Sequence, residues 1–379
     1  MTSVDVCHVL HLSQKPGSNP ISGAERHVLT LLAALASRGA RAELIALIWN
    51  DGPLIRAHLA ELEARGVVVT RISKTPASTR LRRVMTAAAA WSRLCMHLRT
   101  RRDAIVHLHL ELVAPVLAAR LARCARVVAT IHNDEPHYRT LRWRIWLAFV
   151  NRVVRQYIAI STRVARHFSE AAGTAPVTIR TVVYGLDPPK QVPQPRRRLG
   201  LDPEAFVVGF LGRLVPQKNP ELLLRAAADW PECVVAIVGA GPLEGRLNAV
   251  AAELGLTNVK MLGPLADGAS VISAFDILCV PSRWEGFGLN VLEAMLSGVP
   301  VVATATGALP ELLDAGRCGV LVTPESADEL RIALRSLAAD APRRRELAAR
   351  AYERATSFYT VRRMVDETLD VYAGARLAG

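Results

Sequence analysis

Residues 280–298 read VPSRWEGFGLNVLEAMLSG, and this is the most informative stretch of the chain. Its apolar start predicts a buried strand, and the glycines Gly286 and Gly288 predict a turn. From Leu289 onward leucines recur at helical spacing until Gly298, which is a typical stop signal. A strand that turns into a helix in this way leaves backbone N–H groups free at the helix N-terminus, where a phosphate can bind.

Two glutamates, Glu285 and Glu293, lie eight positions apart around this turn. The turn alone would suit an ordinary strand-to-core-helix connection in any α/β protein. A glutamate beside an apolar helix start needs a partner or water, however, so the pair favours a ligand. Glu285 is placed to accept hydrogen bonds from sugar hydroxyls, and Glu293, two turns along, is placed to reach a ribose. The stretch therefore predicts a nucleotide-sugar site.

The string EGFGLNVLEAM at 285–295 resembles the E-x7-E motif of retaining glycosyltransferases with the GT-B fold, family 4 in particular. The resemblance implies that Glu285 contacts the donor sugar and that Glu293 contacts the ribose. It places four further residues at the donor site: Gly286, Phe287, Gly288 and Leu289. It also implies an α/β fold of two facing, doubly wound Rossmann-like domains with a C-terminal helix that crosses back to the first domain.

The 379 residues are enough for two domains, and an apolar fraction of 51% can fill two cores. The six cysteines are scattered without a C-x-x-C pair, which indicates reduced thiols and a cytoplasmic protein. The N-terminal MTSVDVCHVLHL lacks a basic region and reads as a first strand, not a signal peptide. Because no apolar run approaches the roughly 20 residues of a membrane span, we expect a protein that is soluble or peripheral on the inner face of the plasma membrane.

The excess of basic residues lies entirely in the first half. Residues 1–190 hold 27 Lys+Arg and 12 Asp+Glu (27 − 12 = +15), whereas residues 191–379 hold 20 and 22 (20 − 22 = −2). Such asymmetry implies an acidic partner: anionic lipid, a pyrophosphate-linked acceptor or nucleic acid. No nucleic-acid motif accompanies it, so an anionic membrane surface is favoured.

Two arginine-rich segments, 80–102 and 139–155, carry tryptophans. Basic amphipathic helices of this kind suit an interfacial membrane contact, with Trp143 and Trp146 as apolar anchors. The alternative is core-facing helices with solvated arginine faces.

Strand-like runs alternate with helical patterns along the whole chain, which predicts parallel sheets built from βαβ units. In the first half we expect strands at Val6–His11, Ala42–Leu47, Val67–Arg71, Ile105–His109, Val127–Ile131 and Tyr157–Ile160, and helices at 24–38, 54–64, 80–101, 113–123 and 139–154. In the second half we expect strands at Phe206–Leu211, Val234–Val238, Val259–Leu262, Ile277–Val280 and Val301–Ala303, and helices at 220–228, 243–254, 289–297, 326–338, 343–355 and 360–374.

Four prolines between 188 and 195 interrupt this pattern and predict a linker at 188–198. The linker separates an N-terminal domain at 1–187 from a C-terminal domain at 199–357, and a helix within 358–379 completes the chain. The resemblance assigns the acceptor to the first domain and the nucleotide-sugar to the second.

The loop Gly212–Pro220, GRLVPQKNP, follows a predicted strand and brings Arg213 and Lys218 together ahead of a helix that Asn219 is expected to cap. Two cations at this position suit a diphosphate, although isolated Arg and Lys more often lie solvated in surface turns. The loop resembles the family's G-R-x-x-x-x-K-N/G motif, which implies that Arg213 and Lys218 neutralise the departing nucleotide diphosphate and that Gly212 lines the donor site.

The segment Ser22-Gly23-Ala24-Glu25 opens the first helix and resembles the family's G-G-A-E loop over the donor phosphates, with Ser22 in place of the first glycine. An ordinary helix cap is the alternative, because serine is a good N-cap. The turn Gly239-Ala240-Gly241-Pro242 is a weak dinucleotide fingerprint. It resembles the family's G-x-G-P turn, which implies that Gly241 lies near the nucleotide base. The segment 305–311, ATGALPE, is expected to be structural.

His132 ends the predicted strand VVATIH and matches the family histidine that contacts the donor sugar near the reacting centre. His107 and His109 end the preceding strand, and His109 is expected to face the acceptor. A lone histidine is more often a satisfied core residue. Three of them also raise a metal-site interpretation, which we disfavour because no carboxylate pair accompanies them.

The sequence thus predicts a retaining, metal-independent hexosyltransferase-type enzyme without a cofactor. It would move a sugar from a UDP- or GDP-sugar to a saccharide or lipid-linked acceptor hydroxyl, in the synthesis of a bacterial surface polysaccharide or glycolipid. The catalytic candidates are Glu285, His132, Arg213 and Lys218. The alternatives are a non-catalytic nucleotide-sugar-binding protein and a GT-B-type epimerase; a GT-B phosphorylase is disfavoured because lysines are scarce.

Overall fold

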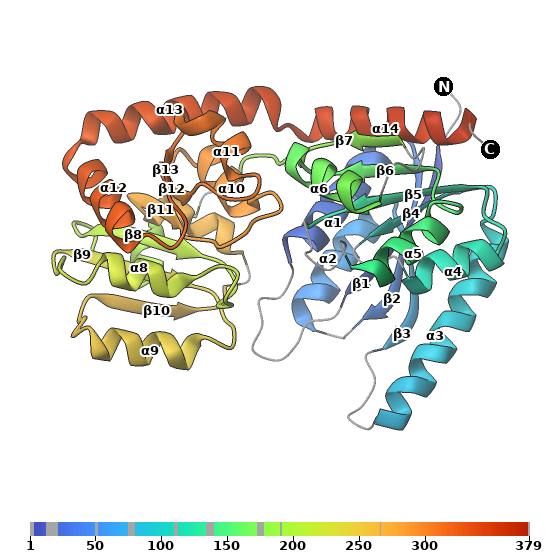
Figure 1. The fold of residues 1–379 in the computed structure, drawn as a ribbon, viewed down its shortest axis with the longest axis horizontal. Coiled ribbons are helices and arrows are strands. Elements are labelled where there is room, and N and C mark those ends of the chain that lie inside the picture. Colours follow the sequence, from blue (N-terminus) through green and yellow to red (C-terminus); the bar gives the residue numbers. More distant parts are fainter. Residues whose placement is uncertain are drawn as a thin grey trace. The chain divides into compact units, whose positions relative to one another are not determined.

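The computed structural model describes residues 4–12, 22–49, 52–74, 80–109, 113–133, 140–172, 178–189, 192–265 and 267–377. They form two compact units (Figure 1). Unit 1 comprises the described residues up to Gly185 together with the C-terminal segment from Val361, and unit 2 comprises Leu186–Thr360.

Unit 1 is built on a seven-stranded parallel sheet of order β3-β2-β1-β4-β5-β6-β7. Its strands are β1 (Asp5–Leu12), β2 (Arg41–Trp49), β3 (Val68–Lys74), β4 (Ile105–His109), β5 (Arg126–Ile131), β6 (Gln156–Ala159) and β7 (Thr178–Thr181). Its helices are α1 (Gly23–Ser37), α2 (Pro53–Ala64), α3 (Arg80–Thr100), α4 (Val113–Leu121), α5 (Leu141–Val150), α6 (Thr162–Ala172) and α14 (Val361–Leu377). The central strands are buried on both faces, as in doubly wound proteins in which helices cover both sides of the sheet.

The C-terminal helix α14 belongs to unit 1, although it follows unit 2 in the sequence. It packs against α1, β5 and β6, and it contributes Met364, Val365, Val371 and Tyr372 to the buried core of that unit. The predicted return of the C-terminal helix to the first domain is confirmed.

Unit 2 is built on a six-stranded parallel sheet of order β10-β9-β8-β11-β12-β13. Its strands are β8 (Phe206–Leu211), β9 (Cys233–Val238), β10 (Val259–Gly263), β11 (Ile277–Val280), β12 (Val301–Thr304) and β13 (Val320–Val322). Its α-helices are α7 (Pro195–Arg198), α8 (Pro220–Ala226), α9 (Glu244–Glu253), α10 (Leu289–Leu296), α11 (Leu309–Leu312), α12 (Ala327–Ala339) and α13 (Ala341–Phe358). The 3₁₀ turns η2 (Gly268–Ala274) and η3 (Asp314–Gly316) complete the unit.

Several elements differ from the sequence-based expectation. Helix α6 and the strands β7 and β13 were not expected from the sequence; the two strands are short and lie partly exposed at the edges of their sheets. Helix α5 is shorter than expected, since the chain turns after Val150. Within the expected linker, Pro195–Arg198 forms one helical turn. Its Arg196 guanidinium donates to the Asp276 carboxylate (2.7 Å) and to backbone carbonyls, which fastens this segment to unit 2.

Each sheet has one point where the strand order reverses, between β1 and β4 in unit 1 and between β8 and β11 in unit 2. In doubly wound sheets ligands bind beyond the carboxyl ends of the strands at this switch point. Within the described residues, every helix is too short or too polar to span a bilayer.

Candidate functional site

In unit 2 the loops that follow β8 and β9 lie against each other at the carboxyl ends of the strands. Gly212 N–H donates to the Val238 carbonyl, and Leu214 N–H donates to the Ala240 carbonyl (3.0 Å each). A Cβ at Gly239 would overlap the Gly212 carbonyl, and one at Gly241 would overlap the Leu214 carbonyl. The glycines of the G-x-G-P turn are therefore needed where two backbones approach closely.

The β8 loop presents the predicted cations on a tight turn. The predicted N-cap position of Asn219 before α8 is confirmed, but its side chain makes no capping hydrogen bond. Asn219 lies at the N-cap position in the left-handed conformation (φ 48°), which asparagine tolerates better than most residues. The preceding Lys218 side chain points back toward the loop that follows β11.

Lys218 forms an ion pair with Glu285, which joins the loops on either side of the switch point. The side chains of Lys218 and Glu285 are only 15% and 10% exposed. The Ser282 hydroxyl donates a further hydrogen bond to the same carboxylate oxygen (3.4 Å). Because a charged pair is costly to bury for stability alone, Lys218 and Glu285 stay candidates for a binding or catalytic role.

The backbone of Glu285 is held from behind by the segment that follows β12. Ala308 N–H donates to the Glu285 carbonyl (3.1 Å), and the Thr304 hydroxyl donates to the Ser282 carbonyl (2.5 Å). Gly307 has φ 57°, and a Cβ there would overlap the Glu285 carbonyl. This supports the structural role predicted for 305–311: the segment fixes the position of the glutamate.

Helix α10 starts where the sequence predicts, with Gly288 as its N-cap in the left-handed region (φ 98°). Glu293 on this helix is buried, and Phe287 packs edge-on against Tyr359. The Asn290 amide donates to the Leu211 carbonyl at the end of β8 (2.9 Å). The helix N-terminus is thereby fastened to the switch point, where its N–H groups and dipole favour an anion.

Arg213 is the exposed member of the predicted set. Its guanidinium donates to the Gln217 side chain (3.0 Å), whose amide in turn donates to the Trp284 carbonyl (3.2 Å). The Arg213 side chain therefore lies along the loops that follow β8 and β11, as the Lys218 side chain does. It is exposed, so a ligand can reach it.

In unit 1, Ser22 forms a capping box with Glu25. The Glu25 N–H donates to the Ser22 hydroxyl (3.4 Å), and the Ser22 N–H donates to the Glu25 carboxylate (2.6 Å). A serine at this position therefore fixes the start of α1, with Gly23 as the first helical residue.

Buried histidines on β1 and β4, together with His132 directly after β5, form one continuous set of hydrogen bonds, which we call the histidine array. His132 Nδ1 is 2.5 Å from the Tyr184 hydroxyl, and its Nε2 is 3.1 Å from His109 Nδ1. His109 Nε2 is 2.8 Å from His8 Nδ1, and His8 Nε2 is 3.0 Å from the Tyr372 hydroxyl. The array contains seven side chains: Tyr184, His132, His109, His8, Tyr372, His107 and Thr130.

The Tyr372 hydroxyl of α14 also lies 2.7 Å from His107 Nδ1, and His107 Nε2 lies 2.7 Å from the Thr130 hydroxyl. His8 and His107 are register partners across the switch point. Burial lowers the pKa of His8 and of His132 to about 3 and holds the pKa of His107 and His109 well below the ordinary value. The four imidazoles are therefore neutral at physiological pH.

The predicted site residues thus fall into two groups, one in each unit. Unit 2 brings together Arg213, Lys218 and Glu285 with the glycine turns and α10. Unit 1 holds Ser22, Gly23 and His132. His8, Tyr184 and Tyr372 were not among the predicted site residues, because they lie far along the chain from the histidines they contact.

Two family models match the chain in sequence. One described as "Glycosyl transferases group 1" matches residues 192–354, and one described as "Glycosyltransferase Family 4" matches residues 21–189. A D-inositol 3-phosphate glycosyltransferase of Rhodococcus erythropolis is 30% identical over 396 residues, which is 93% of this chain and 86% of that relative. The chain belongs to glycosyltransferase family 4.

Other relatives in this family match over shorter stretches. A D-inositol 3-phosphate glycosyltransferase of Stackebrandtia nassauensis is 38% identical over 211 residues, so the alignment spans about half of each protein (50% of this chain and 47% of the relative).

Solved structures confirm the predicted GT-B class. Anabaena HepE in complex with UDP-glucose matches with a TM-score of 0.79 and 25% identity, over 98% of this chain and 99% of that one. The sucrose-phosphate synthase of Thermosynechococcus elongatus has the same fold, with a TM-score of 0.82 and 19% identity over 99% and 100% of the two chains.

Proposed function

We propose that the protein is a retaining glycosyltransferase that moves a sugar from a UDP- or GDP-sugar to an acceptor hydroxyl. The observation that carries this proposal is the ion pair of Lys218 and Glu285 at the switch point of the unit 2 sheet. A buried carboxylate beside a lysine, behind a helix N-terminus, offers acceptors for sugar hydroxyls and donors for phosphate within one loop pair.

In this proposal Glu285 accepts hydrogen bonds from hydroxyls of the donor sugar. The Lys218 ammonium has three hydrogens, so it can hold Glu285 and also donate to a phosphate oxygen. Arg213 adds a bidentate donor that suits the diphosphate. As the bond to the nucleotide breaks, these cations and the α10 N-terminus stabilise the negative charge on the leaving diphosphate.

A uridine nucleotide is the first donor to test, because Anabaena HepE, which shares the fold at 25% identity, was solved with UDP-glucose. For the acceptor, D-inositol 3-phosphate is the first small molecule to test, since the relatives named above act on it. An anionic acceptor also agrees with the excess of basic residues in 1–190. We further propose that in the cell the acceptor is lipid-linked and serves a surface polysaccharide or glycolipid.

A panel of UDP- and GDP-sugars tests the donor, with binding measured by thermal shift and cleavage measured by nucleotide release. We expect one nucleotide class to raise the melting temperature and to be cleaved, with activity retained in EDTA. Binding without cleavage or transfer in the presence of any acceptor would favour the non-catalytic alternative. Activity that EDTA abolishes and manganese restores would contradict the metal-independent mechanism.

We propose that α5 of unit 1 rests on an anionic membrane. Leu141 and Ile145 lie one helical turn apart and are 71% and 66% exposed, and the exposed Arg142 and Arg144 flank them. The anchors expected from the sequence, Trp143 and Trp146, are instead partly buried, and the Trp146 ring stacks on Phe149 (5.2 Å). Arg139 and the side chains of Arg80, Arg82 and Arg83 lie outside the described residues.

Sedimentation with phosphatidylglycerol vesicles tests this surface. Each basic residue at an anionic surface contributes on the order of 1 kcal/mol, so Arg142→Gln with Arg144→Gln should weaken binding by about one to two orders of magnitude. Leu141→Gln with Ile145→Gln should weaken it further, whereas Arg350→Gln on α13 should change nothing. Sedimentation that is equal for neutral and anionic vesicles would contradict the proposal and favour a soluble acceptor.

A further inference from the structure

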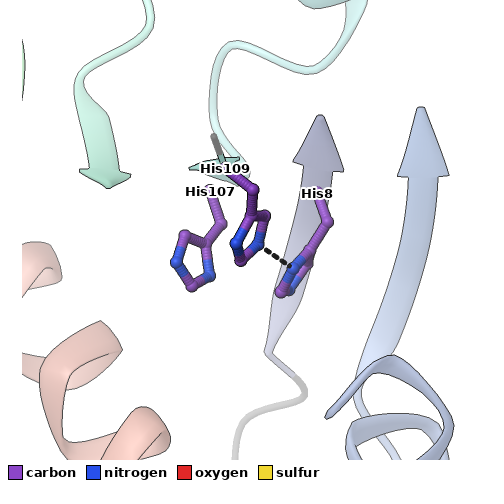
Figure 2. A group of neighbouring side chains, drawn as sticks. All are labelled: His8, His107 and His109. Atoms are coloured by element: carbon purple, nitrogen blue, oxygen red, sulfur yellow. Dashed lines mark hydrogen bonds between the residues drawn. The ribbon is translucent and has the colours of Figure 1, made fainter. Parts of the chain in front are cut away.

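Three imidazoles of the histidine array, those of His8, His107 and His109, point toward one another from β1 and β4 (Figure 2). Their nearest ring nitrogens all lie within 4.8 Å of one another, which is close enough to suggest a metal site. Each of these nitrogens, however, already takes part in a hydrogen bond to another ring or hydroxyl of the array. A metal would have to replace these bonds, so the array is better explained as a set of hydrogen bonds between neutral groups.

The hydrogens of the array can be counted. A neutral imidazole, a phenol and a threonine hydroxyl each carry one N–H or O–H hydrogen. The seven side chains therefore supply seven hydrogens for six hydrogen bonds, and the groups follow one another in a single line. In a neutral imidazole one nitrogen donates and the other accepts. Once one hydrogen bond of a ring is given a direction, the other hydrogen bond of that ring must therefore run in the same direction along the line.

Every histidine in the line has the same orientation. Nδ1 of His132 faces Tyr184, Nδ1 of His109 faces His132, and Nδ1 of His8 faces His109. His107 likewise turns Nδ1 toward Tyr372 and Nε2 toward Thr130. Consequently, if the bonds run one way all four rings carry hydrogen on Nε2, and if they run the other way all four carry it on Nδ1.

Tyr372 couples His107 to the other three rings. Its hydroxyl has one hydrogen and lies between His8 Nε2 and His107 Nδ1, so it donates to one ring and accepts from the other. If both rings donated to its oxygen, the phenol hydrogen would be buried without an acceptor among the described residues, which is unfavourable. Tyr372 therefore transmits the direction of the bonds across the switch point.

We propose that the four imidazoles share one tautomer and that Tyr372 of α14 is a positioning residue for His132 through this array. This rests on the proposed function and on the contact with the donor sugar that the family resemblance implies for His132. Both ring nitrogens of His132 are hydrogen-bonded in unit 1, so one bond must open for that contact. If the bond to Tyr184 opens, the shared tautomer decides whether His132 Nδ1 accepts from or donates to a sugar hydroxyl.

Nitrogen-15 NMR of ring-labelled histidines tests the proposal on the whole protein, with signals assigned from single His→Gln variants. The ring shifts distinguish hydrogen on Nδ1 from hydrogen on Nε2. We expect His8, His107, His109 and His132 to show the same tautomer. A mixture among the four would overturn the proposal. So would stoichiometric uptake of Co²⁺ that removes the signals of His8, His107 and His109, since that would reveal a metal site.

Tyr372→Phe removes only the hydroxyl between the two rings. We expect His107 to change tautomer independently of His8, His109 and His132, and turnover to fall about tenfold, which corresponds to one hydrogen bond. Tyr157→Phe is the matched control, because it removes another buried hydroxyl of unit 1, one that donates to Asn151 outside the array. It should leave both the tautomers and turnover unchanged.

The variants Tyr372→Phe and Tyr157→Phe, compared with the wild type, distinguish a failure of the positioning role of Tyr372 from a failure of the proposed function. If Tyr372→Phe left the tautomers coupled, or if Tyr157→Phe lowered turnover equally, Tyr372 would have no positioning role. If wild-type protein cleaved no donor, the proposed function would fail, whereas the NMR result would still decide whether the array shares one tautomer.

Discussion

Two glutamates, Glu43 in unit 1 and Glu285 in unit 2, are both almost completely buried, at 3% and 7% exposed. Glu43 is surrounded by four donors from β1, β3 and the C-terminal end of α3: the His97 ring (2.7 Å), the Thr70 hydroxyl (2.6 Å), the Arg101 guanidinium (3.0 Å) and the Cys7 thiol (3.3 Å). Glu285 has one lysine and one serine, both from loops at the carboxyl ends of strands. A fully surrounded carboxylate stabilises the fold, whereas one that shares a lysine at a switch point is suited to a ligand.

The difference should appear most strongly in the stability of Glu43→Gln. Removing one partner of a buried charge cluster costs about 3–5 kcal/mol, so the free energy of unfolding of unit 1 should fall by that amount in urea titrations. Glu61→Gln is the control, because Glu61 is exposed and pairs with the exposed Arg65 at the C-terminal end of α2; it should change stability by less than about 0.5 kcal/mol. If both substitutions lowered the free energy of unfolding equally, Glu43 would stabilise the fold no more than an exposed glutamate does.

Glu285→Gln should show the opposite pattern, with a large loss of activity and a small loss of stability. Removing an electrostatic group from a preorganised site costs about a hundred- to a thousandfold in turnover. We expect this loss with a melting temperature close to that of the wild type. Glu325→Gln, which breaks an exposed ion pair with Arg283 in the same unit, should keep full activity. A folded Glu285→Gln protein with normal turnover would refute the assignment.

Acid should unfold unit 1 through Glu43. Burial raises the pKa of Glu43, but hydrogen bonds from His97 and Thr70 outweigh it, and the pKa falls from 4.5 to about 2. Since the folded-state pKa is lowered, the stabilisation is present above about pH 4.5 and is lost as pH falls toward 2. The shift corresponds to about 3 kcal/mol. Urea titrations across this pH range should show that loss in the wild type and a flatter profile in Glu43→Gln.

The smallest effects are expected for the two cations. A charge-assisted hydrogen bond contributes roughly 1.5–3 kcal/mol, so Lys218→Ala and Arg213→Ala should each reduce turnover about ten- to a hundredfold. Lys218→Ala should be the more damaging, because it also leaves the Glu285 charge buried without its partner. Steady-state kinetics with the preferred donor measure the turnover of both variants. A larger loss of turnover in Arg213→Ala than in Lys218→Ala would indicate that Glu285 does not need Lys218 as a partner.

The sequence could reveal Glu285 but not Glu43 for a physical reason. The turn, the helix start and both glutamates of the E-x7-E stretch lie within twenty residues, so local geometry places them. The donors around Glu43 come from β1, β3 and α3, and they meet only when the sheet forms. The same applies to His8 and Tyr372, which lie 364 positions apart. Long strands and helices were predictable from periodicity, whereas β7 and β13 were not, because strands of four and three residues are too short to show a period.

The position of α14 has a consequence for the order in which the protein becomes complete during synthesis. Leu186–Thr360 is one uninterrupted segment, so unit 2 can finish folding as soon as it leaves the ribosome. Unit 1 leaves first, yet it lacks Met364, Val365 and Tyr372 until the last helix has been made. Until then part of its core and the hydroxyl that joins His8 to His107 are missing. A nascent or truncated protein without the C-terminal helix would therefore hold a finished unit 2 beside an incomplete unit 1.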